Sequence, residues 1–532
     1  MTARRWTRHG LTGLALLVVS AVPATALTVL NRGNGAETKS LDPHFIDGIQ
    51  ESNVEGDILT GLFACDAAGR PIPGAATRWE TSPDGKTWTF HLRGELWSDG
   101  RPLTAHDFVF AWQRLLDPAT GASYAYNLWV LRNAHAISSG KLPPSTLGVS
   151  APDDHTLVVR LEHPAAYLPE LLTHDTAYPL PRHVVRSKGN AWSKPGNFVG
   201  NGAYVPKEWI VNDHLTLVKN PRFYDAANVR IDVVNYYPTP DSNTALRQFR
   251  TGELDIQTPI PLTQIEWLRK TMPAVLHTKP YIGLSYIAIN LKRPPLDDIR
   301  IRRALNLALD RDVLTDKVLR LGEPAAYGIV PPGIVNYPFG AAYDFRKLPM
   351  AARLAKAQWL MHEAGYGPDR PLRLVFETFD EPNNKRVAAV LQAMLREIWV
   401  YIDIVAIDAA VHGRNMTSGN FDLGMASWFA DFNDASNFLD LLRADAGNNY
   451  GRYSNPAYEA LLNAAQEEPD AARRGRMLAQ AEALALQDYP WIPVRFRTTQ
   501  NLVQTYVKGW VDNGRDMHRT RWLWLAAKPV KF

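Results

Sequence analysis

Strict alternation of apolar and polar residues over residues 86–93 is the clearest hydrophobic pattern in the chain. Alternation of this kind places the apolar side chains on one face and predicts a half-buried strand. After a short turn, apolar residues recur at helical spacing over residues 108–116. Thr104 and Asp107 form the sequence pattern of a capping box at the start of this helix. The region is therefore predicted to be a strand, a turn and an amphipathic helix.

Similar patterns predict two α/β halves. The first half is predicted to contain strands at residues 27–31, 155–164, 231–237 and 254–256, helices at residues 52–62 and 244–250, and a hairpin within residues 196–220. The second half is predicted to contain strands at residues 281–290, 372–376, 402–407 and 491–496, a strand from Phe421, and helices at residues 298–309, 351–364, 387–398, 456–467 and 471–487. Strands that alternate with helices indicate sheets with crossover connections.

The length of 532 residues exceeds what one compact core supports. It suggests about three or four structural units. Hydrophobic residues make up 46% of the chain and charged residues 21%, which is ordinary for a globular protein. The 16 tryptophans and 20 tyrosines suit large cores and ligand pockets equally well. Composition alone therefore does not select a function.

The first 26 residues have the pattern of a secretory signal peptide. Arg4, Arg5 and Arg8 precede an apolar run at residues 11–22, and small residues end the segment at Ala26. We expect cleavage after Ala26, by general secretion in preference to a twin-arginine route. The apolar run is too short for a permanent membrane span. Loss of the three arginines lowers the formal net charge from +4 to +1, so nothing in the charge favours nucleic acid as a partner.

Motifs for catalysis or metal binding are absent from the sequence. It contains no Gly-x-Ser-x-Gly elbow, His-Glu-x-x-His motif or phosphate-binding loop. Its single cysteine, Cys65, excludes an internal disulfide and cysteine-based metal clusters. His44 and His412 are interpreted as solvated loop histidines. No cofactor, metal or enzymatic activity is therefore expected, and an exported peptide hydrolase is the less favoured alternative.

Residues 421–437 combine an apolar strand pattern with a dense mixture of aromatic rings and carboxylates. Carboxylates among rings are costly to bury unless a cation meets them. One interpretation is a strand end followed by a helix cap, with Asp434 or Ser436 as the capping residue. The other is a ligand cleft in which Asp431 meets a positive group of the ligand.

Six motifs, in this order, decide between these interpretations. They are SLDPH at residues 40–44, the stretch at residues 84–118, NGAY at residues 201–204, RRALNLALDRD at residues 302–312, EAGY at residues 363–366 and WFADFND at residues 428–434. Together they resemble the extracellular solute-binding proteins, family 5, which serve ABC-type peptide importers, and within it the periplasmic oligopeptide-binding proteins. The resemblance covers nearly the whole chain after the signal segment.

The resemblance implies an α/β protein with the type II periplasmic-binding fold. Domain I would comprise residues 27–59, 184–285 and 497–532, the extra domain II residues 60–183, and domain III residues 286–496. Domains I and III would close over the ligand by a hinge motion. A peptide would be held as an added strand. The implied partners are a peptide and the permease subunits of an inner-membrane importer, and a periplasmic monomer is expected.

By position, the resemblance implies that Asp431 pairs with the α-amino group of the peptide. The other implied ligand contacts are Trp428 and Phe429 on the adjacent strand, Asp47 and Ile49 at the domain I edge, Tyr124 in domain II, and the pair Asn448 and Asn449 in a side-chain pocket. A packing or turn role is the alternative for each of these seven positions.

Two departures from the family concern the other end of the ligand. Met416 and Met425 stand where oligopeptide binders carry arginines for the peptide carboxylate, and methionine cannot anchor an anion. Arg495 and Arg497 stand where relatives tend to carry tyrosines. We hypothesise that one of these two arginines supplies a substitute anion contact, with plain ion pairing as the alternative. The departures also make a murein peptide or another amine-bearing solute an alternative ligand, and a secreted chaperone or adhesion role is a remoter one.

Overall fold

The computed structural model describes residues 1–2, 27–46, 48–337 and 340–527. Nearly all of the expected signal segment, including Ala26, lies outside these ranges, as does Asp47. Within the described ranges, no helix is long and apolar enough to cross a membrane.

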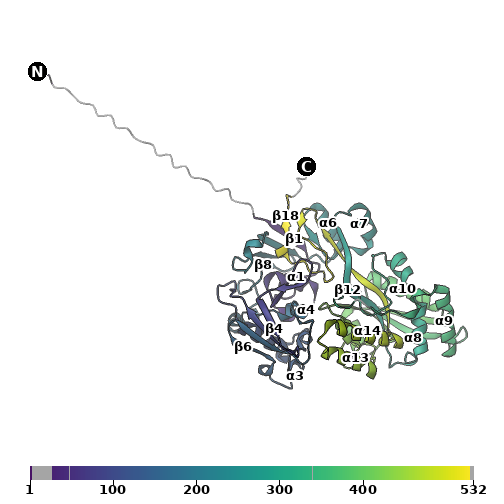
Figure 1. The fold of residues 1–532 in the computed structure, drawn as a ribbon. Coiled ribbons are helices and arrows are strands. Elements are labelled where there is room, and N and C mark those ends of the chain that lie inside the picture. Colours follow the sequence, from purple (N-terminus) through teal and green to yellow (C-terminus); the bar gives the residue numbers. More distant parts are fainter. Residues whose placement is uncertain (3–26, 47, 338–339, 528–532) are drawn as a thin grey trace.

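A ten-stranded mixed sheet runs through both lobes of the molecule (Figure 1). In spatial order its strands are β14 (Val400–Ile407), β13 (Leu372–Phe379), β15 (Leu423–Phe429), β12 (Leu276–Ile289), β16 (Trp491–Val503), β11 (Ile256–Gln257), β1 (Val29–Gly33), β10 (Val233–Tyr237), β9 (His214–Lys219) and β8 (Tyr204–Ile210). Figure 1 shows the long strands β12 and β16 passing together from one lobe to the other.

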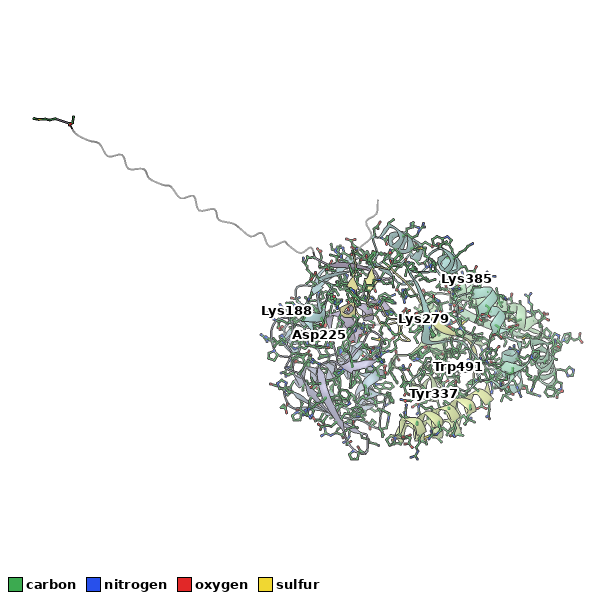
Figure 2. All side chains as sticks on the ribbon, turned by 45° about the horizontal axis from the view of Figure 1, so that its top comes forward. Lys188, Asp225, Lys279, Tyr337, Lys385 and Trp491 are labelled. Carbon is green, nitrogen blue, oxygen red and sulfur yellow. The ribbon has the colours of Figure 1, made fainter. Side chains whose placement is uncertain are left out.

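The pairing of β12 with β16 is irregular where the strands cross between the lobes. Their antiparallel register shifts between Pro280 and Leu284 and again between Ser285 and Tyr286. Such irregularities bend a strand and increase its twist. The C-terminal half of β12 is buried between β15 and β16, where Tyr286 stacks on Trp491 with 3.9 Å between ring centroids. Figure 2 labels Trp491 in the second lobe.

In the second lobe, parallel strands β13, β14 and β15 join the antiparallel pair β12 and β16. Strands β13 and β14 pair in parallel over their full lengths, and β13 pairs with β15 only at Leu423 and Gly424. The apolar stripe of α8 is buried as its spacing predicts. The helices of this lobe are α8 (Ile299–Ala308), α9 (Met350–Glu363), α10 (Pro382–Arg396), α11 (Ala409–Ser418), α12 (Ser436–Leu439), α13 (Pro456–Glu467) and α14 (Ala471–Asp488).

The first lobe carries a separate four-stranded antiparallel sheet. Its order is β4 (Ala76–Thr81), β5 (Thr87–Leu92), β7 (Thr156–Arg160) and β6 (Val149–Asp153). The alternating residues of β5 are buried on one face, and Thr104 and Asp107 form the predicted capping box of α2 (Ala105–Leu116). The remaining elements are α1 (Ile49–Ile58), α3 (Ala134–Ser138), α4 (Leu168–Leu171), α5 (Arg182–Lys188), α6 (Ser242–Thr251), α7 (Ile265–Thr271), β2 (Phe63–Cys65), β3 (Pro71–Pro73), β17 (Val507–Lys508) and β18 (Trp524–Leu525).

Candidate functional site

The candidate site begins where β15 leaves the sheet. Phe429 lies opposite Gly283 of β12, and a β-carbon on Gly283 would approach the Phe429 ring to 2.7 Å. A glycine is therefore needed for this close approach. The ladder ends one residue later, where Ala430 N donates to Ile282 O at 3.0 Å. The chain then turns out of the sheet at Asp431.

Asp431 is a half-buried carboxylate that accepts long hydrogen bonds from two uncharged donors. Its Oδ2 accepts from the Tyr126 hydroxyl at 3.4 Å and from Asn437 Nδ2 at 3.5 Å. Asn437 Oδ1 in turn accepts from Trp428 Nε1 at 2.8 Å. Burial raises the pKa of Asp431, and this rise is opposed first by His174 and then by the Asn437 and Tyr126 bonds. Within the described ranges, Asp431 has no ion-pair partner.

Asp434, only three residues later, has the opposite environment. Its two oxygens accept from Arg474 Nη1 and Nη2 at 2.6 and 2.8 Å, and both side chains are almost fully buried. Asp434 Oδ1 also accepts from Ser436 N at 2.9 Å and from Ser436 Oγ at 2.7 Å. Asp434 therefore bonds the turn before α12, as the first interpretation expects, although Ala435 is the N-cap residue. The ligand cleft of the second interpretation stays a prediction. Asp434 has an ion-pair partner, whereas Asp431 has none among the residues that the structure describes.

The two lobes meet at the Asp431 segment. Arg515, from the C-terminal part of the first lobe, donates to Asp431 O at 3.0 Å and to Thr173 Oγ1 at 2.6 Å. Tyr167 stacks on Phe432 with 5.0 Å between ring centroids. A cavity of about 220 Å³ lies in this contact, lined by residues of both lobes. The carboxylate of Asp431 therefore lies at the surface where the lobes approach each other.

Phe429 links this segment to a cluster of two arginines and one glutamate. Its ring lies 4.8 Å from that of Tyr281, and the Arg497 guanidinium lies 5.3 Å from its centroid. Arg495 Nε and Arg497 Nε lie 2.8 and 2.9 Å from the two oxygens of buried Glu323. Because two cations share one carboxylate, the cluster carries a net positive charge. Arg495 is buried, whereas Arg497 keeps 21% of its side chain exposed.

The two methionines lie in the core of the second lobe. Met416 and Met425 are 2% and 4% exposed. The Met416 sulfur packs against Gly424, where a β-carbon would approach it to 2.2 Å. Met425 contributes its backbone carbonyl to a bond with His412 Nε2 at 2.8 Å. Neither side chain is available to hold an anion.

The remaining predicted contacts are divided between the site and other parts of the fold. Tyr124 lies beside the site, with its ring 5.5 Å from that of Tyr126 and 5.6 Å from that of His174. Ile49 begins α1 and is 47% exposed. Asp47 lies outside the described residues.

The two predicted asparagines form hydrogen bonds within a turn. Asn449 is 1% exposed and donates from Nδ2 to Arg443 O at 2.9 Å and to Tyr453 O at 2.8 Å. Its Oδ1 accepts from Tyr453 N at 3.0 Å. Half-buried Asn448 accepts from the Tyr450 hydroxyl at 3.3 Å. The side chain of Asn449 therefore bonds the backbone of its own turn, which is the alternative role given for it.

Several residues of the site are not apparent from the sequence, among them Tyr126, Asn437, Glu323 and Arg515. Tyr126 is separated from its partner Asp431 by 305 positions. The sequence feature that could have indicated Tyr126 is its position two residues after Tyr124, which was a predicted contact. Arg515 and Glu323 carried no local signal, because their partners come from other segments of the chain.

The interpretation of the two histidines as solvated was wrong. His44 is 1% exposed, its Nδ1 lies 2.6 Å from Arg114 Nη1, and burial lowers its pKa to about 3. His412 is 6% exposed, and its Nδ1 lies 2.7 Å from Glu377 Oε1. Both nitrogens of His412 and the Nδ1 nitrogen of His44 have partners in other segments of the chain, which local sequence does not show.

Comparison with known proteins places this chain in a family. The family model described as bacterial extracellular solute-binding proteins, family 5, middle, matches residues 70–450. The periplasmic oligopeptide-binding protein OppA of Salmonella typhimurium is 36% identical over 524 residues, which cover 95% of this chain and 95% of that protein.

Solved structures agree with this match. The crystal structure of Haemophilus influenzae OppA in complex with RPPGFSPFR is 36% identical, with a TM-score of 0.83, and the match covers 94% of this chain and 99% of that one. The Escherichia coli murein tripeptide binding protein MppA is 33% identical, with a TM-score of 0.84, over 95% of this chain and 99% of that one. The chain therefore belongs to the bacterial extracellular solute-binding proteins, family 5, and has their periplasmic-binding fold.

Proposed function

We propose that this protein is an exported receptor that captures peptides between its two lobes and delivers them to an ABC-type importer of the inner membrane. The observation that carries the proposal is Asp431, a half-buried carboxylate without an ion-pair partner among the described residues, at the surface where the lobes meet. The receptor acts as a monomer and performs no chemistry on the peptide.

In this proposal, Asp431 binds the α-amino group of the peptide. Such a charge-assisted bond contributes about 1.5–3 kcal/mol net. The hydrogen bonds that Tyr126 and Asn437 donate to Asp431 are long, at 3.4 and 3.5 Å, so the carboxylate is oriented without being neutralised. Arg515 holds the backbone of Asp431 from the opposite lobe, which couples the amine contact to lobe closure.

The open edge of β15 provides a place for the peptide backbone. Strand β13 pairs with β15 only at Leu423 and Gly424, so the rest of β15 has one edge without a strand partner in the described structure. Ala430 N points towards β12, and the alternation of backbone groups then directs those of Ser427 and Phe429 to the open edge. A peptide added there as a strand would bind through its main chain at any sequence.

The proposed closure divides the molecule as the resemblance implies, with domain II at residues 60–183 and a hinge near residues 285 and 497. The irregular pairing of β12 and β16 between Pro280 and Tyr286 supports a hinge at this point. Cleavage of a signal peptide after Ala26 remains part of the proposal.

One experiment tests the proposed function directly. The protein, purified from its native host, is denatured, and any ligand that is released is identified by mass spectrometry. We expect peptides with free amino termini. Murein peptides in place of ordinary oligopeptides would favour the alternative ligand that the uncharged Met416 and Met425 suggest. A ligand without an amine would contradict both kinds of peptide ligand.

Incubation of peptides with the protein should leave them intact, whereas turnover would favour a hydrolase.

Arg497 is proposed as the contact for the peptide carboxylate, with Arg495 behind it. Because Glu323 already compensates one of the two charges and Arg497 is partly exposed, we expect Arg497→Ala to weaken binding of a free-acid peptide by roughly two- to fivefold. Binding of the same peptide as its C-terminal amide should be unchanged. Isothermal titration calorimetry measures both, with Arg473→Ala, at an exposed arginine of the second lobe, as the control. Unchanged affinity in both Arg495→Ala and Arg497→Ala would remove the two arginines from the site.

Binding should also weaken on acidification. Burial raises the pKa of Asp431 above its ordinary value of 3.8, while an α-amino group stays protonated at neutral and acidic pH. Affinity should therefore be complete at neutral pH and fall as the pH drops through the raised pKa, because the proton and the amine compete for one carboxylate. Calorimetry across this range, with an N-acetylated peptide for comparison, checks the assignment. The same decline for both peptides would assign the pH dependence to another group.

A further inference from the structure

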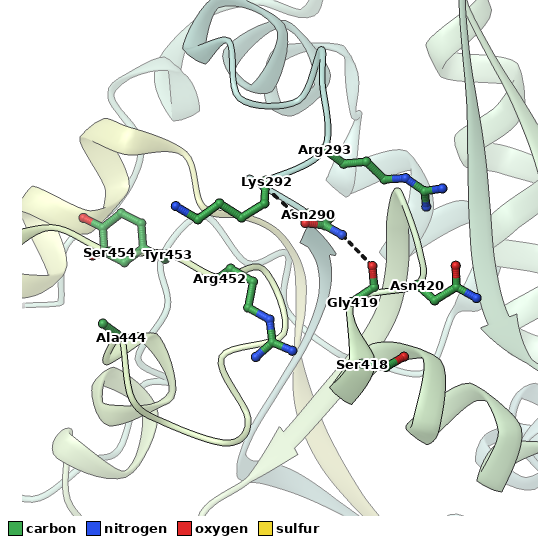
Figure 3. A pocket seen from close by; sticks show the side chains of 10 residues that line it. All are labelled: Asn290, Lys292, Arg293, Ser418, Gly419, Asn420, Ala444, Arg452, Tyr453 and Ser454. Atoms are coloured by element: carbon green, nitrogen blue, oxygen red, sulfur yellow. Dashed lines mark hydrogen bonds between the residues drawn. The ribbon is translucent and has the colours of Figure 1, made fainter.

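A second hollow, of about 860 Å³, lies at the far end of β15 from Asp431 (Figure 3). It is lined by residues from segments 290–293, 418–420 and 444–454, and we call it the cationic hollow. The chain enters β15 from its 418–420 segment and leaves β15 towards Asp431. Strand β15 separates the two sites by about 20 Å, because a strand rises about 3.3 Å per residue. The cationic hollow is therefore distinct from the peptide site.

Two buried asparagines fix the loops that surround the hollow. Asn290 is 4% exposed, donates to Gly419 O at 2.9 Å and accepts from Lys292 N at 3.2 Å (Figure 3). Asn449 donates to Tyr453 O at 2.8 Å and accepts from Tyr453 N at 3.0 Å. Buried side chains that bond the backbone of neighbouring loops hold them in one arrangement. The hollow is therefore preformed.

The lining is cationic and contains no carboxylate among the described residues. Lys292 is exposed and has no ion-pair partner in the described part of the chain. Arg452 has a φ of 57°, a left-handed backbone that is uncommon for a residue with a side chain. Its guanidinium donates to Thr417 O, which leaves its other donors available. Arg293 pairs with Asp422 at 3.2 Å, so Lys292 and Arg452 are the two uncompensated charges.

Figure 3 shows how these side chains surround the space. Lys292 and Arg293 extend to opposite sides of the turn after β12, and Arg452 lies between them. Asn420 and Ser454 add exposed polar side chains on either side of the hollow. An arginine fork and a lysine ammonium are the groups that proteins use for phosphate, while amide and hydroxyl side chains suit hydroxyl groups.

We propose that the cationic hollow binds a phosphate ester whose organic part carries hydroxyl groups. The volume supports an ester over a lone phosphate ion, because it falls in the range of sites for small organic ligands. Glycerol phosphate has this chemistry, and it occurs both as a soluble metabolite and in the headgroup of phosphatidylglycerol. The proposal does not rest on peptide binding, because none of the residues assigned to the peptide lines the hollow.

The test compares the wild-type protein with two double variants. Lys292→Gln with Arg452→Gln removes the two uncompensated charges of the hollow. Lys141→Gln with Lys188→Gln removes the same charge from exposed positions of the other lobe, where Lys188 lies at the outer surface (Figure 2). Binding of glycerol 3-phosphate is measured by calorimetry. Binding to the headgroup is measured by cosedimentation with phosphatidylglycerol vesicles, with phosphatidylcholine vesicles as the reference.

We expect the wild type and the Lys141/Lys188 variant to bind at least one of the two probes saturably. The Lys292/Arg452 variant should bind it at least tenfold more weakly, with peptide affinity unchanged in all three proteins. Saturation by the soluble ester alone assigns the free metabolite as the ligand, and binding to the phosphatidylglycerol vesicles alone assigns the headgroup. Failure of the wild type to bind either probe, or equal weakening by both double variants, overturns the proposal.

Discussion

Replacement of Asp431 by asparagine should weaken the binding of a peptide with a free amino terminus by about 10- to 150-fold, the loss of one charge-assisted bond. The substitution keeps the shape of the side chain and its ability to accept from Tyr126 and Asn437. What it removes is the negative charge that the ammonium group would meet. Isothermal titration calorimetry with a peptide identified from the purified protein measures the effect.

Two controls separate this effect from general damage. Folding stability should be nearly unchanged in Asp431→Asn, because Asp431 has no ion pair to lose in the described structure. Asp445→Asn, at an exposed position of the same lobe, should bind peptide like the wild type. Peptide affinity that survives in Asp431→Asn would mean that the amino group is held elsewhere.

Replacement of Arg474 by alanine should act on stability instead. It leaves Asp434 buried without its bidentate partner, and loss of one member of a buried ion pair costs about 3–5 kcal/mol. We expect the free energy of unfolding to fall by about this amount. Denaturant unfolding, with the linear extrapolation applied to the second lobe's transition, measures it.

Arg473→Ala is the matched comparison, because this neighbouring arginine pairs with Glu468 but keeps 66% of its side chain exposed. An exposed pair of this kind is worth about 0–1 kcal/mol. If the two alanine variants lose the same stability, the Asp434–Arg474 pair does not have the structural role assigned to it.

Local patterns in the sequence predict the elements that have one buried face and one exposed face. The alternation in β5 and the capping box of α2 are reproduced residue by residue. The predicted strand at residues 281–290 was too short, because β12 begins at Leu276. Lys279 and Pro280 interrupt the apolar pattern there, because both side chains are exposed where the strand crosses between the lobes.

Local patterns could not predict the candidate site in the same way, because it is assembled from segments that are distant in the sequence. Asp431 and Asp434 are chemically identical and three positions apart, and only the fold shows that Arg474 meets one of them. In the same way, Arg495 and Arg497 stand out in the sequence as unusual charges, but the sequence does not show that they share Glu323 as a partner. The resemblance to the family provided the role of Asp431, which hydrophobic patterning could not.

The most direct test of the central claim is a double-mutant cycle on the amine contact. It uses the wild type and Asp431→Asn, each with a free-amine peptide and its N-acetylated form. Acetylation should weaken binding to the wild type by about 10- to 150-fold and have little further effect on Asp431→Asn, because the two changes remove the same bond. If acetylation weakens binding equally in both proteins, Asp431 does not hold the amino group of the peptide.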